Sequence, residues 1–375
     1  MQSPLCLPEI VDRLELSKPQ CFCPAVRRRE VDPITGRVVA IVPARQARHF
    51  EHRENDPALL RTERGECLFC RFATPSTLFF IDPDESIRVP CEHESMEAAR
   101  RFLEGRVPYR IETHYDLVQA LAPLNVSGDR HLARVFRNLT PATDTAIGEW
   151  CTVTALNPSY HDYEFHDLPN PAVRALVRSW QVQEAVARAQ RLTFVGFVNG
   201  GKRRESGQSV ACCHGQSYGV RKAPTLYEHI SDRRERVHGG ACPVCRELLN
   251  AEIVATYGVW CPEDSEVVVL AHPAPLHNWS LLVLPRAHVE DIGDINAAHF
   301  ASALQAAIRG LRGQFGGEPA FNVVLRVGPA VGHVHAEIVP RTSVNILAGW
   351  EIAGHEIVIT VDPRSIAAEL SLRVP

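Results

Sequence analysis

The sequence predicts an α+β protein made of two tandem units, and three observations support this. Each part of the chain opens with a Cys-x-x-Cys pair, Cys67/Cys70 in the first and Cys242/Cys245 in the second. A histidine follows each pair, and an amphipathic helix and a buried strand follow each histidine. Each unit then has a Cys/His-rich strand, which begins Cys212-Cys-His214 in the first and His333-Val-His335 in the second. The repeated order indicates an internal duplication.

Hydrophobic periodicity predicts the elements of the first unit. Apolar residues recur at helical spacing over 171–190, and Pro171 suits the first turn of a helix. Apolar or alternating runs predict strands at 37–43, 147–155, 192–198 and 209–217.

The second unit repeats this succession after a stretch that contains Pro and Gly. Helical patterns cover 243–257, 296–314 and 363–372. Strands are predicted at 266–271, 280–285, 320–327 and 333–340.

The composition excludes several classes of protein. The chain has 375 residues, of which 45% are hydrophobic and 22% charged, as in a globular protein with a full core. Its net charge of −4 argues against a nucleic-acid-binding protein with a basic surface. No apolar run approaches the roughly 18 residues that a membrane span needs, and the acidic N-terminal region is unlike a signal peptide. We therefore expect a cytoplasmic protein with no nucleic-acid or membrane partner.

Cysteine and histidine are abundant, with 12 and 17 residues. In a cytosolic chain this indicates metal binding or catalysis before disulfides, although free cysteines also behave as small buried hydrophobes. The Cys-x-x-Cys spacing lets both thiolates reach one ion, and no second pair follows at short range, so distant segments must supply the other ligands. We predict one zinc site made of Cys67, Cys70, His161 and Cys212, and another made of Cys242, Cys245, His288 and His333.

Both predicted zinc sites are structural, because four nitrogen and sulfur ligands leave no coordination position for a substrate. Taken alone, His161 would more often be a surface histidine. Its position, which matches that of His288 in the second unit, favours the ligand role.

The residue most suited to chemistry is His214. If Cys212 binds zinc, the alternation of a strand sends Cys213 to the other face and returns His214 and Gln216 to the zinc side. A rigidly held neutral imidazole is a good nucleophile toward phosphorus, and an amide two residues away can donate to a phosphoryl oxygen. From the residues alone, a histidine beside two cysteines is more often a further metal ligand, so that alternative stays open.

The polar segment from Asn199 to Ser209 contains three glycines and two serines that suit a phosphate-binding loop, in the sequence Asn-Gly-Gly-Lys-Arg-Arg-Glu-Ser-Gly-Gln-Ser. It lacks the Gly-Lys-Ser/Thr ending of a Walker A loop. It also lacks a Gly-x-Ser-x-Gly nucleophile elbow, which disfavours a serine hydrolase.

Over about residues 31–375, these motifs resemble the galactose-1-phosphate uridylyltransferase family of the histidine-triad superfamily. The similar segments are Asp32–Gly36, Pro43–Arg48, Cys67–Cys70, Asn138–Pro141, Asn157–His161, Phe197–Ser209, Leu284–His288, Ile338–Arg341 and Gly349–Glu351. The stretch Cys212-Cys-His-Gly-Gln216 matches the family's active-site His-Pro-His-x-Gln in its last His and its Gln.

The resemblance implies two tandem histidine-triad-like units with antiparallel sheets and flanking helices, each with a structural zinc site. It divides the chain into an N-terminal extension (1–30), a catalytic half (31–236, with an atypical insertion at 71–137) and a C-terminal half (237–375). It also implies a homodimer.

The resemblance further implies a double displacement in galactose metabolism. His214 would take a nucleoside monophosphate, typically UMP, from a nucleoside-diphosphate sugar and pass it to a sugar 1-phosphate, with Gln216 assisting. The substrate-binding residues implied are Arg45, Arg48, Asn138, Asn199, Gly207, Ser209 and Glu351. Without the resemblance, Arg45 and Arg48 are equally well explained as a solvated charge pair at a strand end.

Several positions depart from the family pattern. Cys212 and Cys213 replace a His and a Pro, Asn345 stands where a sugar-phosphate-binding Lys is expected, and Arg326 stands where a ligand of an iron site belongs. The second zinc set is more like the plant ADP-glucose phosphorylase branch. Two alternatives therefore remain: a phosphorylase that uses inorganic phosphate on ADP-glucose or a dinucleoside polyphosphate, and a non-catalytic zinc-stabilised nucleotide-binding protein.

Overall fold

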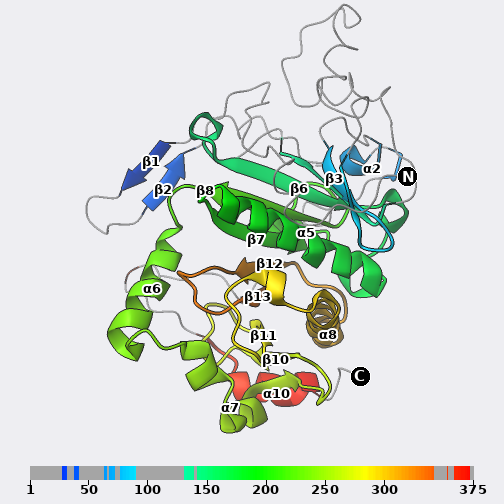
Figure 1. Cartoon of the computed structure of the whole chain (residues 1–375). Coiled ribbons are helices and arrows are strands. Elements are labelled where there is room, and N and C mark those ends of the chain that lie inside the picture. The colour runs from blue at the N-terminus through cyan, green and yellow to red at the C-terminus, as the bar shows by residue number, and fades with distance from the viewer. Residues whose placement is uncertain are drawn as a thin grey trace, which may run out of the picture.

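The computed structural model describes residues 28–31, 38–41, 63–65, 67–71, 77–89, 131–138, 142–341, 353 and 359–371. Within them the main feature is an antiparallel sheet of 11 strands in the order β4-β3-β5-β6-β8-β7-β12-β13-β11-β10-β9 (Figure 1). Two further strands, β1 (Arg28–Val31) and β2 (Val38–Ile41), pair with each other. The predicted α+β class with an antiparallel sheet is confirmed.

The strand order repeats about the centre of the sheet, where β7 (Thr193–Gly200) pairs with β12 (Phe321–Arg326). Next to each of these two central strands lies the strand that follows it in the chain. Beyond that neighbour lie the two strands that precede the central strand in the chain. On one side these are β8 (His214–Val220), β6 (Trp150–Leu156) and β5 (Ala133–Arg137), with β3 (Thr77–Ile81) and β4 (Ile87–Arg88) outermost. On the other side they are β13 (His335–Pro340), β11 (Leu281–Pro285) and β10 (Val267–Ala271), with β9 (Gly258–Trp260) outermost.

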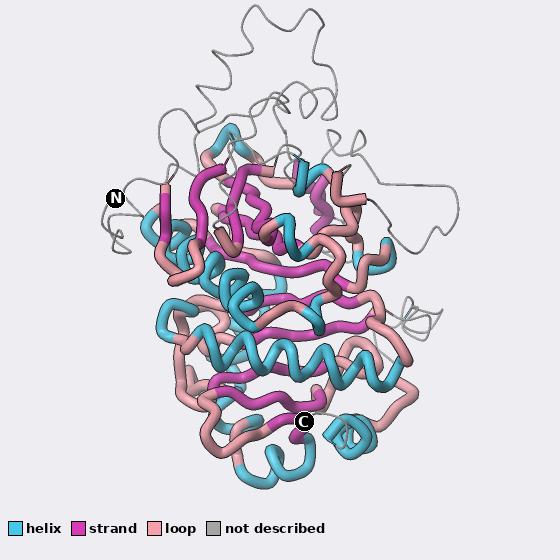
Figure 2. The backbone as a smooth tube through the Cα atoms, turned by 90° about the vertical axis from the view of Figure 1, so that its right-hand side faces the viewer, coloured by secondary structure: helices cyan, strands magenta, loops and turns pink. Residues whose placement is uncertain are grey.

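Two long helices cover one face of this sheet (Figure 2). They are α5 (Asn170–Ala189), which precedes β7, and α8 (Ala297–Phe315), which precedes β12. The main core lies between the helices and the sheet and contains Trp180, Phe300 and Phe321, each at most 1% exposed. The opposite face is left for the functional residues, because side chains alternate between the two faces of a strand.

The remaining helical elements are shorter or lie at the periphery. They are α2 (Leu68–Arg71), α6 (Thr225–His238), α7 (Ala251–Tyr257), α10 (Pro363–Ser371), a π-helical turn (Val244–Leu248), and 3-10 turns at Thr145–Ile147, Pro158–Tyr160, Phe165–Asp167, Arg204–Ser206 and Ile292–Asp294. None of the described helices combines the length and hydropathy of a membrane-spanning segment.

Several elements differ from those predicted from the sequence. The strand predicted at 209–217 begins only at His214, and the helix predicted at 243–257 is interrupted at Asn250, whose side chain caps α7 by accepting from the backbone N–H of Ile253. Helix α6 was not predicted, because Tyr227 is its only buried residue and it therefore lacks an apolar stripe. The segment 71–137, set apart as an insertion, supplies β3, β4 and β5 to the sheet.

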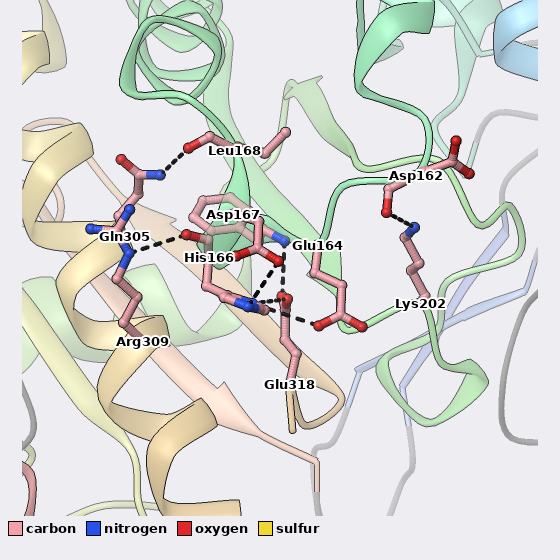
Figure 3. A network of polar contacts seen from close by, with 10 residues as sticks. Asp162, Glu164, His166, Asp167, Leu168, Lys202, Gln305, Arg309 and Glu318 are labelled. Atoms are coloured by element: carbon pink, nitrogen blue, oxygen red, sulfur yellow. Dashed lines mark hydrogen bonds and ion pairs between the residues drawn. The ribbon is translucent and has the colours of Figure 1, made fainter. Parts of the chain in front are cut away.

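A buried polar network joins the segment after His161 to the approach to β12 (Figure 3). His166 Nδ1 donates to Glu318 Oε2 at 2.7 Å, and Glu318 Oε1 accepts from the backbone N–H of Phe165 at 3.2 Å. Burial raises the pKa of the Glu318 carboxyl, and the hydrogen bond from His166 opposes that rise. Arg309 adds a bond from Nε to the carbonyl of His166 at 3.1 Å. The network fastens the loop that follows the predicted metal ligand His161 to the half of the sheet that contains β12.

Candidate functional site

The eight predicted metal ligands come together in two groups of four. In the first cluster, defined as Cys67, Cys70, His161 and Cys212, the ligand atoms all lie within 4.8 Å of one another. Cys67 directly precedes α2 and Cys70 lies within it. His161 caps the C-terminal end of the 3-10 turn Pro158–Tyr160, and Cys212 lies just before β8. Three distant segments therefore meet at one point.

The distances in the first cluster suit a tetrahedral ion. With metal–sulfur bonds of about 2.3 Å, two sulfur ligands of a tetrahedral zinc lie about 3.8 Å apart. Cys70 Sγ is 3.7 Å from Cys212 Sγ and 3.2 Å from His161 Nδ1. The donor set, three thiols and an imidazole, is one that zinc prefers, so these residues fit the ion.

The protonation of the first cluster also favours a cation. Hydrogen bonds from the Cys212 and Cys67 thiols lower the pKa of Cys70 to about 4. The same contacts, with burial, raise the pKa of Cys212. The low pKa of Cys70 indicates that the cluster already carries negative charge on sulfur, and a divalent ion would compete with protons for these sulfur atoms.

The second cluster, defined as Cys242, Cys245, His288 and His333, has the same compactness and lies beside a cavity of about 430 Å³. Cys242 Sγ and Cys245 Sγ lie 3.5 and 3.4 Å from His333 Nδ1, and Cys245 Sγ lies 3.5 Å from His288 Nδ1. His333 Nε2 donates to the carbonyl of Pro285 at 3.1 Å. This bond leaves the Nδ1 lone pair for a metal, which is the arrangement typical of a histidine ligand.

The predicted nucleophile, His214, is the first residue of β8 and is 1% exposed. Its Nδ1 lies 2.8 Å from the carbonyl oxygen of Cys212. A carbonyl oxygen only accepts, so Nδ1 carries the proton and Nε2 keeps the lone pair required for attack. His335 has the same relation to the carbonyl of His333, at 2.9 Å.

The first cluster and His214 share a face of the sheet and touch through Phe69, which lies inside the Cys-x-x-Cys turn. The Phe69 ring packs edge-on against the His214 imidazole, with centroids 4.8 Å apart and planes at 73°. Cys213 lies on the opposite face in the main core, where burial raises its pKa to about 12. Cys212 and Cys213, which lie just before β8, thus pack on opposite sides, as the sequence predicted.

The other predicted substrate residues lie around this face or outside the described residues. Asn199 is the last residue but one of β7, and Gly207 has a φ of 82° and caps the 3-10 turn before it. Ser209 and Gln216 are each 6% exposed. Asn138, just after β5, donates from its backbone N–H to the carbonyl of Cys151 at 2.9 Å. The described part of the chain does not include Arg45, Arg48 and Glu351.

Sequence reasoning missed Asn322, which organises the predicted phosphate loop. Its Nδ2 donates to Asn199 Oδ1 and to the carbonyl of Ser206, both at 2.7 Å. Because Asn199 Oδ1 accepts this bond, the Asn199 amide turns its Nδ2 toward Gly207. The available signal was a single amide in an otherwise apolar strand, Phe-Asn-Val-Val-Leu-Arg.

Replacing Asn322 with Ala is expected to lower the rate of group transfer by about tenfold or more, because a misplaced loop donor no longer meets the developing charge. Loss of the two bonds would also cost about 1–3 kcal/mol of stability. The matched control is Asn170→Ala, which removes two side-chain bonds, to Ser302 and Gln305, at the start of α5. Steady-state kinetics and thermal melting of both variants test this. Equal effects on the rate would contradict the role of Asn322.

A comparison with known families identifies the second half of the sheet. Residues 258–344, which include β9 to β13 and α8, match the family model of the HIT domain. This stretch, about a quarter of the chain, is similar to a HIT domain. Within it lie His288, His333 and His335. At the level of sequence, no curated protein is significantly similar to the chain.

Solved structures show that the fold extends beyond the HIT domain. An ADP-glucose phosphorylase from Arabidopsis thaliana, solved with bound ADP-glucose, matches with a TM-score of 0.57 and 17% identity over 92% of this chain and 98% of its own. A GalT-like protein from Arabidopsis thaliana matches with a TM-score of 0.55 and 18% identity, over 70% of this chain and 86% of its own. A uridylyltransferase mutant matches with a TM-score of 0.56 and 18% identity, over 64% of this chain and 88% of its own.

At these identities the likeness establishes a shared fold. Together with the match of residues 258–344 to the HIT domain, it confirms the resemblance predicted from the motifs at the level of the fold, which is shared with a uridylyltransferase and an ADP-glucose phosphorylase.

Proposed function

We propose that the protein is a nucleotidyltransferase that moves a nucleoside monophosphate from a nucleoside-diphosphate hexose to a second anionic acceptor, through a nucleotidyl group on His214. The observation that carries the proposal is the tautomer of His214, whose Nδ1–H is held by the Cys212 carbonyl. An imidazole held in this tautomer has its lone pair on Nε2, and such a nitrogen is suited to attack phosphorus.

The first step forms a bond between His214 Nε2 and the α-phosphorus and breaks the bond from that phosphorus to the bridging oxygen, releasing hexose 1-phosphate. In the second step an acceptor oxygen attacks the same phosphorus and the P–N bond breaks. Gln216 and Ser209 bind the phosphoryl oxygens, and Asn199, held by Asn322, donates from the loop. The proton stays on His214 Nδ1, hydrogen-bonded to the Cys212 carbonyl, in both steps.

The proposal extends to the residues and assemblies implied by the sequence. Arg45 and Arg48 bind the anionic diphosphate or sugar phosphate, Asn138 and Gly207 contact the nucleotide and phosphate, and Glu351 binds sugar hydroxyls. The chain consists of an extension (1–30) and two tandem histidine-triad-like halves (31–236 and 237–375), and it forms a homodimer. The repeated strand order about β7 and β12 supports the tandem arrangement.

Zinc is the metal proposed for both clusters. When bound, it supplies structural cross-links, because each cluster already provides four ligands and leaves no position for substrate. The first cluster would hold the turn that carries Phe69 against His214. The second would fasten the start of the C-terminal half to β13.

Two reactions share the first step and differ in the acceptor. With hexose 1-phosphate as acceptor the protein is a uridylyltransferase of the galactose-1-phosphate type. With inorganic phosphate it is a phosphorylase, a candidate favoured by the ADP-glucose phosphorylase whose fold matches 92% of this chain.

Product analysis distinguishes these activities. The protein is incubated with UDP-glucose, UDP-galactose, ADP-glucose or a dinucleoside polyphosphate. Each donor is combined with either inorganic phosphate or a hexose 1-phosphate whose sugar differs from that of the donor. A new nucleotide sugar with the sugar phosphate only identifies a transferase, and a nucleoside diphosphate with inorganic phosphate only identifies a phosphorylase. Binding of nucleotide with neither product would show a non-catalytic nucleotide-binding protein and would overturn the proposal.

A further inference from the structure

Arg134 is a buried cation on the face of the sheet that holds the first cluster. It lies in β5 opposite Phe80 and Ala155, and it is only 1% exposed. A guanidinium so deeply buried loses its hydration, which costs several kcal/mol unless nearby negative charge compensates for it. The position therefore needs an anion close by.

The contacts of Arg134 lead to the Cys-x-x-Cys turn. Its Nη2 donates to the carbonyl oxygen of Phe69, between the two cysteines of the pair, and its Cζ lies 5.4 Å from the centre of the Phe136 ring. The charges that stabilise its protonated form are those of Cys212, Cys70 and Cys67, whereas burial lowers its pKa to about 10. The guanidinium is therefore still charged at neutral pH.

The two clusters differ in their charge. Around a divalent ion, the three thiolates and one imidazole of the first cluster leave one net negative charge, whereas the two thiolates and two imidazoles of the second leave none. Near the second cluster, Arg234 forms ion pairs with Glu235 and Glu290. The buried arginine thus lies beside the cluster whose charge requires it.

We propose that Arg134 is the counter-ion of the first cluster. Cys212, as the third thiolate, gives this cluster the negative charge that the arginine compensates. Arg134 acts through the metal ligands and the Phe69 carbonyl, so it is a positioning residue for the turn that packs on His214. The inference rests on the proposal that the first cluster holds zinc. It predicts that exchanging the third thiolate for a neutral imidazole removes the requirement for the arginine.

The test is a double-mutant cycle read out by zinc binding. Zinc content and competition with a chromogenic chelator are measured for the wild type, Arg134→Met, Cys212→His and the double variant. Arg134→Met is expected to weaken zinc binding at the first cluster by about 10- to 100-fold. In the Cys212→His background the same change is expected to have less than about a threefold effect. Arg134→Lys, which keeps the charge, should retain most of the affinity.

The control is Arg178→Met, which removes a partly buried arginine of α5 that bonds to Gln181. It should leave zinc affinity unchanged. Equal losses from Arg134→Met in both backgrounds, or equal losses from the Met and Lys variants, would overturn the counter-ion role. If Arg134→Met alone is insoluble, recovery of soluble, zinc-loaded protein in the Cys212→His background supports the proposal, and no recovery refutes it. Wild-type zinc content that Cys67→Ser does not reduce would instead refute the metal centre itself.

Discussion

Replacing His214 with Asn is expected to lower nucleotidyl transfer by about 10³-fold or more, because the covalent route requires the Nε2 lone pair. An asparagine side chain can still donate to the Cys212 carbonyl, so the start of β8 should keep its geometry. The expected kinetic result is a fall in kcat with little change in the affinity for the nucleotide sugar. Steady-state rates and nucleotide binding by calorimetry measure the two quantities separately.

His335 provides the matched control for this variant. It begins β13 as His214 begins β8, and its Nδ1 makes the same bond to the carbonyl two residues earlier. Burial lowers its pKa to about 4, so it is neutral at physiological pH. His335→Asn should leave transfer within about threefold of the wild type, as expected for a change distant from the reacting atoms. Equal loss in the two variants would show that His214 acts through the fold rather than through attack.

Replacing Cys67 with Ser is expected to have the largest effect on stability. Apparent binding free energies of structural zinc are on the order of 10 kcal/mol, comparable with the whole stability of a domain. The first cluster joins α2, the segment that ends at His161 and the start of β8, so its loss should free all three. We expect zinc content to fall by one ion per chain, and thermal melting should show a destabilised protein.

Cys213→Ala is the control for the loss of a buried thiol. This neighbour of Cys212 faces the main core, and burial raises its pKa to about 12, so it remains a neutral thiol. Its truncation should cost about 1–2 kcal/mol and leave zinc content unchanged. A Cys67→Ser protein with full zinc content and the stability of Cys213→Ala would contradict a metal at the first cluster.

Much of the fold followed from the sequence because the sheet is built from local hydrophobic patterns. The helix over Asn170–Ala189 and the strand over Leu281–Pro285 agree with their predictions to within one residue at each end. Patterns failed where tertiary packing decides. Helix α6 buries only Tyr227, and the two-residue β4 is too short to show a period.

The candidate site was predictable to the extent that ligand types and spacing reveal it. Both sets of four metal ligands were chosen from motif order, and the fold brings each set within 4.8 Å. Arg134 and Asn322 could not be found this way, because each contacts a segment that is distant in sequence. Arg134 reaches the Phe69 carbonyl 65 residues away, and Asn322 reaches Asn199 across 123 residues. Only the folded chain brings such residues together.

The covalent intermediate is the central claim, and the mass of the intact protein tests it most directly. Zinc-loaded protein is incubated separately with UDP-glucose, UDP-galactose and ADP-glucose without acceptor, and any adduct is located by peptide mapping. The account predicts a gain equal to one UMP or AMP group, on the peptide that contains His214, which disappears when acceptor is added. No gain with any donor, or a gain on a different peptide, would contradict it.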